Sequence, residues 1–141
     1  MEKHTVSVLA ENHAGVLSRV VGMFSRRGFN IDSLSVGTTV DENISRITIE
    51  VLGDSQVVEQ VGKQLSKIVE VIKVKTLKDN EMVKRGLLLC KVKTTAKTRG
   101  EIMEITNVFR AKIVDISQTT ITIEMMIRLD VLSDIFQIHS S

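Results

Sequence analysis

The 141 residues of this chain suffice for one ordinary domain or two small ones, and a hydrophobic content of 43% excludes wholesale disorder. The 19 basic and 17 acidic residues leave a net charge of +2, too small for bulk charge to drive nucleic-acid binding. Apolar runs stay short of membrane-spanning length and the start shows no signal-peptide pattern, so we expect a cytoplasmic protein.

The first elements are a strand over residues 5–10 and a helix that Gly28 is expected to end. Between them, the polar turn at residues 12–15 would leave backbone N–H groups at the start of the helix, where a small anion such as a carboxylate binds well. This turn indicates binding rather than catalysis. One helical face is apolar, formed by Leu17, Val20, Val21 and Phe24, and the opposite, solvated face carries Arg19, Arg26 and Arg27.

In the rest of the first half, apolar and polar residues alternate in three segments as they do in strands, and one further helix is predicted between them. Residues 33–40 predict a strand with Leu34, Val36, Thr38 and Val40 on one side, and residues 46–51 a strand with Ile47, Ile49 and Val51 inward. Gly53, Asp54 and Ser55 then break the chain and cap a helix with the apolar stripe Val57, Val61, Leu65 and Ile68. A strand over 69–77 completes a β-α-β-β-α-β order, the ferredoxin-like module. Its strands are apolar and one sheet face lacks helices, so we expect two copies to pair.

Residues 78–82 predict a linker to a second domain at 83–141. The pattern restarts with a strand at 85–94, a helix at 98–111 and strands at 112–117 and 119–124. The helix would bury Ile102, Ile105 and Phe109, and Cys90, the single cysteine, is predicted to be a packed core thiol. From residue 125 the tail is atypical, with a short helix lined by Met125, Leu129, Leu132 and Phe136. The fold class is therefore α+β, with a βαββαβ domain at 1–77 and an incomplete αβ domain after it.

Together these residues resemble a known family. The stretch VLAENHAGVLSRVVGMFSRRGFNIDSLSVG, followed by SRITIEV, GD and VIKVKTL, is similar to the small regulatory subunits of acetolactate synthase (acetohydroxyacid synthase). The likeness spans about residues 3–124, including EIMEITNVFRAKIVDIS. It implies an N-terminal ACT domain that binds an effector and dimerises. The family continues past residue 124 with a glycine-containing turn, a helix and a closing strand, so the different tail here predicts weaker activation of the partner.

The resemblance also implies a function. A non-catalytic regulatory subunit of branched-chain amino acid biosynthesis would assemble with a large catalytic subunit that carries thiamine diphosphate, magnesium and FAD. It would raise the activity of that subunit and make it sensitive to feedback inhibition by a branched-chain amino acid, usually valine. The compartment would be the cytoplasm, or the plastid stroma for an organelle-encoded chain. An amino-acid-sensing ACT protein that regulates a different partner stays open as the alternative.

The family's effector contacts map onto Asn12 and Gly15 in the first turn and onto Asn30 and Ile31 after the helix, with His13 and Ala14 as further candidates. The chemistry of these residues agrees with that role. Glycine allows a carboxylate to approach the backbone, the two carboxamides can both donate and accept, and the isoleucine can form an apolar wall. For the histidine, a solvated loop position is the competing interpretation.

Other function classes find little support in the sequence. An RNA-binding module of the same element order stacks bases on aromatic residues of its central strands, whereas all four phenylalanines lie outside the predicted strands. No nucleophile–base pair, phosphate-binding glycine loop or paired-carboxylate site is present, so no catalytic residue is predicted. The histidines, the cysteine and the carboxylates form no recognisable metal motif.

Overall fold

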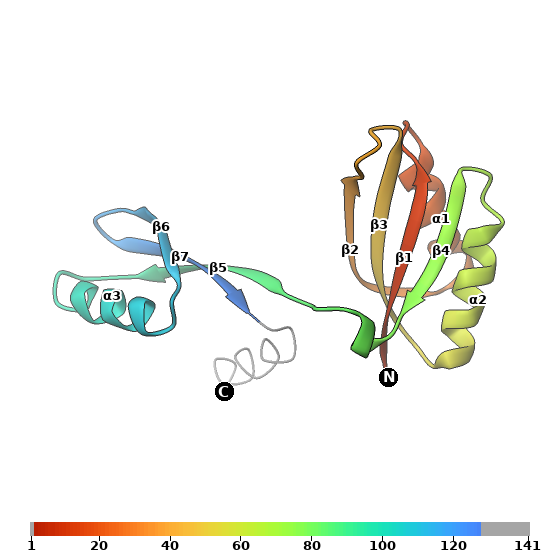
Figure 1. Cartoon of the computed structure of the whole chain (residues 1–141). Coiled ribbons are helices and arrows are strands. Elements are labelled where there is room, and N and C mark those ends of the chain that lie inside the picture. The colour runs from red at the N-terminus through yellow and green to blue at the C-terminus, as the bar shows by residue number, and fades with distance from the viewer. Residues whose placement is uncertain (1, 128–141) are drawn as a thin grey trace. The chain divides into compact units, whose positions relative to one another are not determined.

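The structure, a computed structural model, describes residues 2–127 and divides into two compact units between Met82 and Val83 (Figure 1). Within the described residues, no helix is both long and apolar enough to cross a membrane. The elements of the first unit are β1 (Lys3–Glu11), α1 (Val16–Arg27), β2 (Asn30–Thr38), β3 (Ile44–Leu52), α2 (Ser55–Ser66), β4 (Val71–Leu77) and the short 3-10 helix η1 (Asp79–Glu81).

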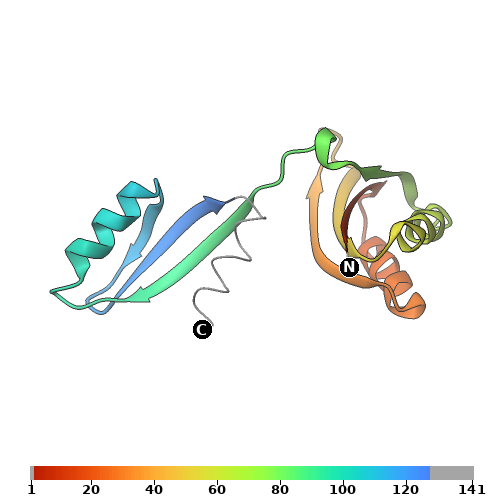
Figure 2. The ribbon, with the colours of Figure 1, turned by 90° about the horizontal axis from the view of Figure 1, so that it is seen from below.

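The first unit confirms the predicted βαββαβ order. Its four strands form one antiparallel sheet in the order β2-β3-β1-β4, and both helices cover the same face (Figures 1 and 2). Asp54 caps α2 as predicted, because its Oδ1 accepts a hydrogen bond of 2.9 Å from the N–H of Val57. The core between sheet and helices is formed by Val6, Val8, Ala10, Val16, Val20, Met23, Phe24, Ile47, Ile49, Val51, Val58, Val61 and Leu65.

The predicted apolar face of α1 is half right, because Val20 and Phe24 are buried but Leu17 and Val21 are not. Val16 and Met23 are buried, whereas Leu17 is 40% exposed and Val21 is only partly covered. The helix begins directly after Gly15, and the buried positions 16, 20, 23 and 24 follow the spacing i, i+4, i+7 and i+8 from that start.

The edge strand β2 also differs from its prediction. It begins at Asn30 and ends at Thr38, and Asp32 forms a bulge between the paired positions of Ile31 and Ser33. Val40 lies beyond the strand in the following turn and is fully exposed. The last strand of the sheet starts two residues later than predicted, leaving Val69 exposed in the preceding turn.

The sheet face opposite the helices is mainly polar, which corrects the expectation of an uncovered apolar face on this unit. The register places Thr5 beside Glu50 and Ser7 beside Thr48, so these side chains share the face away from the core. The apolar residues of β1 and β3 that alternate with them point toward the helices. An exposed apolar sheet face is therefore no reason for two copies of this unit to pair.

The second unit is a smaller αβ arrangement. Its elements are β5 (Gly86–Lys93), α3 (Arg99–Val108), β6 (Lys112–Ile116) and β7 (Thr120–Ile127), with the three strands in the order β5-β7-β6. β7 continues through Met125, so the predicted helix cannot start there; Leu129, Leu132 and Phe136 lie outside the described residues.

Two predictions about the core of the second unit are wrong. Cys90 is exposed, because β5 is an edge strand of the described sheet and α3 lies against β6, on the other side of β7. The predicted apolar face of α3 is largely open as well, with Ile105 50% and Phe109 66% exposed. Thr106 is the buried residue of that helix.

Candidate functional site

The turn between β1 and α1 presents backbone donors at a helix start. Gly15 has a φ of 88° and a ψ of −15°, a left-handed conformation that glycine adopts without strain. The N–H of Val16 bonds weakly to the carbonyl of His13 at 3.4 Å, and that of Arg19 bonds to the carbonyl of Gly15 at 3.1 Å. Across the described residues, the N–H groups of Leu17 and Ser18 have no hydrogen-bond acceptor. Two amide donors thus remain for a small anion.

Asn12 holds this turn against the β2–β3 turn. Its backbone N–H donates to the carbonyl of Asn43 at 2.8 Å, and its side-chain Nδ2 donates to the carbonyl of Glu42 at 2.8 Å. One amide hydrogen and the carbonyl oxygen of the carboxamide remain for a ligand. The residue therefore positions the turn and can still contact what binds there.

Arg19 lies over the glycine turn, although sequence reasoning assigned it to a solvated helix face. Its Nη1 is 3.3 Å from where a Cβ on Gly15 would stand, and its guanidinium forms an ion pair with Glu70 in the α2–β4 turn. The backbone N–H of Glu70 itself, and then Arg19, keep the pKa of the Glu70 carboxyl below its usual value despite desolvation. The spacing Gly15-to-Arg19, one helical turn, is the signal that could have identified this arginine.

His13 is exposed and contacts two of its neighbours. Its Nε2 lies 2.9 Å from Oε2 of Glu11, and its Nδ1 lies 3.4 Å from the carbonyl oxygen of Ala14. The Glu11 carboxylate, and then the Ala14 carbonyl, raise the pKa of His13 above its ordinary value. Ala14 contributes its backbone to the same turn.

We expect the Glu11→Gln substitution to lower the pKa of His13 toward the ordinary histidine value. The carboxylate stabilises the charged imidazolium, so its removal favours deprotonation at a lower pH. The titration of the His13 ring proton by NMR measures this change, and Glu59→Gln on α2 serves as the control. A His13 pKa that is the same in the parent and Glu11→Gln proteins would show that the contact does not form in solution.

Asn30 and Ile31 lie at the other end of α1 from the glycine turn. They begin β2, directly after Gly28 ends the helix, and Ile31 packs partly against the core while Asn30 is exposed. The twelve residues of α1, at a rise of about 1.5 Å each, separate the two sets by about 18 Å. Within one chain the structure therefore brings residues 12–15 together, and Asn30 with Ile31, but does not bring the two sets together.

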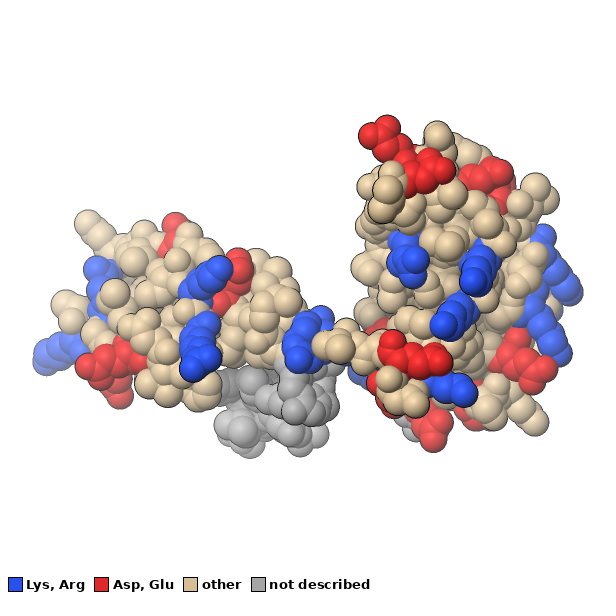
Figure 3. Space-filling model, viewed as in Figure 1, with Lys and Arg blue, Asp and Glu red and all other residues tan. Residues whose placement is uncertain are grey.

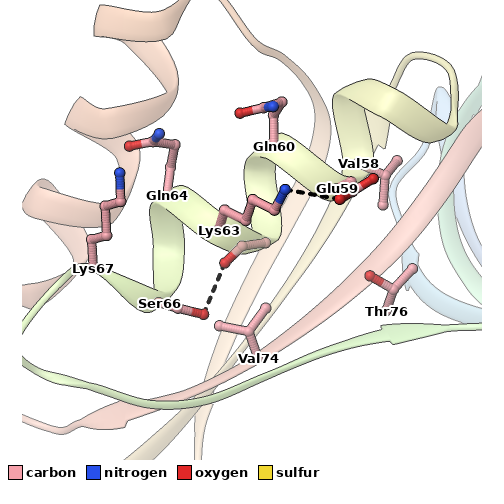
Figure 4. Close-up of a pocket in the computed structure, with 10 residues that line it drawn as sticks. Val58, Glu59, Gln60, Lys63, Gln64, Ser66, Lys67, Val74 and Thr76 are labelled. Atoms are coloured by element: carbon pink, nitrogen blue, oxygen red, sulfur yellow. Dashed lines mark hydrogen bonds and ion pairs between the residues drawn. The ribbon is translucent and has the colours of Figure 1, made fainter.

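A separate groove of about 600 Å³ lies between α2 and β4 (Figure 4). It is open, most of the residues that line it are polar or charged, and an ion pair of 2.9 Å between Lys63 and Glu59 lies along it. None of the predicted effector residues lines it. Over residues 2–127, no group of three histidine, cysteine, aspartate or glutamate residues is placed to hold a metal ion.

Comparison with known proteins gives consistent matches along the chain. Residues 6–73 match the family model of the acetohydroxyacid synthase small subunit-like ACT domain. Residues 85–138 match the model described as small subunit of acetolactate synthase, a match that continues past residue 125.

Individual proteins agree with the family models. A probable acetolactate synthase small subunit of Archaeoglobus fulgidus is 54% identical over 123 residues, which cover 87% of this chain and 77% of that protein. The acetolactate synthase small subunit of Mycobacterium avium is 49% identical over 87% of this chain and 74% of its own length. The crystal structure of the small subunit from Thermotoga maritima superimposes with a TM-score of 0.87 at 35% identity, covering 98% of this chain and 86% of that one.

Proposed function

Since this chain belongs to the family of acetolactate synthase small subunits, we propose that it binds a branched-chain amino acid, valine or a close relative, and thereby regulates a catalytic partner. The protein is a regulatory, non-catalytic subunit. In the proposal, its large catalytic subunit holds the thiamine diphosphate, magnesium and FAD. This chain raises the activity of that subunit and makes it sensitive to feedback inhibition.

The observation that carries the proposal is the glycine turn with its unpartnered amide donors. The carboxylate of a free amino acid accepts from the N–H groups of Leu17 and Ser18, next to Gly15. The guanidinium of Arg19, which is paired with Glu70, adds N–H donors on the same side. The ammonium group requires acceptors, which the carboxamide oxygens of Asn12 and Asn30 supply.

A second copy of the chain is needed to complete this site, because its two halves are about 18 Å apart in one copy. β2 is an edge strand, so two copies can pair along it. A twofold axis through an antiparallel β2–β2 contact would place the glycine turn of one copy beside the Asn30 and Ile31 of the other. In this proposal residues 1–77 form the effector-binding and dimerising domain, residues 78–82 the linker and residues 83–141 the second domain.

Asn30→Ala is expected to weaken valine binding about tenfold or more while the fold stays intact. Hydrogen bonds to charged groups contribute about 1.5–3 kcal/mol, and 1.4 kcal/mol corresponds to a factor of ten in affinity. Isothermal titration calorimetry measures the affinity, circular dichroism monitors the fold, and Asn80→Ala in η1 is the matched control. An unchanged affinity for Asn30→Ala would remove this residue from the site.

Reconstitution with the large subunit of the same organism tests the regulatory role itself. Addition of this chain is expected to raise the rate of acetolactate formation and to make that rate sensitive to valine. The Asn30→Ala chain should still raise the rate but confer less valine sensitivity. A catalytic subunit that is unaffected by the chain would contradict the proposal.

A further inference from the structure

Three cations gather on the open face of the first sheet without acidic partners. Arg46 on β3 and Lys73 on β4 are both register partners of Leu9, and Lys75 is the partner of Ser7, so the three share the face away from the helices. All three are exposed, and Figure 3 shows basic groups gathered on this face. Among the described residues, none of the three forms an ion pair.

One of the three cations, Arg46, is held in place by a residue in the middle of this face. Arg46 donates a hydrogen bond of 3.1 Å from Nη1 to Oγ of Ser7, which holds its guanidinium over the central strand. Ser7 and its neighbour Thr5 are almost fully buried beneath the surrounding side chains. The Cα positions of Lys73 and Arg46 are two strands apart, about 10 Å, so the cations form one patch.

The shape and composition of the face favour a protein surface as its partner. The three cations line neither the groove between α2 and β4 nor the hollow around Thr5 and Leu77, so they form no pocket for a small anion. The phenylalanines of this unit, Phe24 and Phe29, pack at the core side, so the face has no aromatic platform for nucleic-acid bases. Two copies of the face laid together would oppose like charges.

We propose that this open face docks onto an acidic surface of the catalytic large subunit. The identity of the partner rests on the proposed function, whereas the location of the contact rests on the cations themselves. Four strands spaced about 4.8 Å apart and about seven residues long give a face of roughly 19 by 24 Å. The area of such a face is about half of the roughly 800 Å² that each partner contributes to a standard protein–protein interface. Charge attraction of this kind accelerates association and weakens as salt increases.

The double substitution Lys73→Glu and Lys75→Glu tests the proposal without touching the core or Arg46. Lys63→Glu with Lys67→Glu is the control, because it makes the same change in net charge on α2, behind the sheet. Binding of each full chain to the large subunit is measured without valine, in low and in high salt. The affinity for valine is measured separately on each variant.

The β4 variant is expected to bind the large subunit about tenfold more weakly in low salt, and the difference from the parent should shrink in high salt. The control should change less than twofold, and both variants should keep the parent affinity for valine. Equal binding by the parent and the β4 variant, or an equal loss in the control, would overturn the docking assignment. A parent chain that does not bind the large subunit at all would contradict the proposed function as well.

Discussion

Replacing Gly15 with alanine is expected to weaken valine binding at least tenfold while the first unit still folds. The residue has a φ of 88°, where a side chain costs about 1 kcal/mol or more. A Cβ would also stand 3.3 Å from Nη1 of Arg19, so the guanidinium over the turn would have to shift by a few tenths of an ångström. Both effects act where the proposal places the carboxylate.

Gly62→Ala provides the matched control for this substitution. Gly62 lies in α2, where a Cβ meets no atom within 4 Å, and alanine is the better helix former by about 1 kcal/mol. The control should therefore keep its affinity for valine and become slightly more stable to denaturant. Calorimetric titration of both variants measures the effect, and an unaltered valine affinity in Gly15→Ala would refute the assignment of the turn.

Phe24→Ala is expected to cause the largest loss of stability, about 3–5 kcal/mol. The side chain is 1% exposed in the centre of the core, and its ring packs edge-on against Phe29 with the centroids 6.1 Å apart. Small domains have a total stability of about 5–15 kcal/mol, so this loss would remove a large part of the stability of the first unit. Valine binding would fall in proportion to the fraction of unfolded chain, because α1 carries the turn.

Phe109→Ala is the control for the loss of a phenyl ring, since Phe109 is 66% exposed at the end of α3. Its substitution should change the free energy of unfolding by less than about 1 kcal/mol. Urea denaturation followed by circular dichroism measures both variants. A loss below 1 kcal/mol for Phe24→Ala would contradict the packing of α1 against the sheet.

The strand and helix order of the first unit could be predicted because its alternation is strong. Ile47, Ile49 and Val51 are buried as expected, since a central strand under two helices has one fully covered face. The face of α1 was predicted correctly at Val20 and Phe24, but Val16 and Met23 are buried in place of Leu17 and Val21. Two neighbouring stripes both fit the helical period, and only packing against the sheet distinguishes them.

Burial in the second unit was less predictable. The apolar run around Cys90 is typical of a core strand, but the burial of a strand depends on which other elements cover it. β5 lies at the edge of its sheet and α3 contacts the far strand, so a thiol predicted to be packed is exposed. The sequence pattern contains no information on that placement.

The candidate site, too, could be predicted only in part from the sequence. The composition of the first turn was enough to indicate anion binding, but the bond from Asn12 to Glu42 joins residues thirty positions apart and required the fold. The ion pair between Arg19 and Glu70 likewise joins α1 to a distant turn. Only the topology shows that β2 is an edge strand along which a second copy can pair, although the sequence already placed Gly15 and Asn30 at opposite ends of one helix.

That separation makes a mixed dimer the most direct test of the central claim, a site shared between two copies. One chain carries Gly15→Ala and the other Asn30→Ala, with different tags so that the mixed dimer can be purified. If each site combines the turn of one copy with the Asn30 of the other, one site contains both substitutions and the other contains neither. Calorimetry should then find one valine bound per mixed dimer with the parent affinity. The absence of any site with that affinity would contradict a shared site.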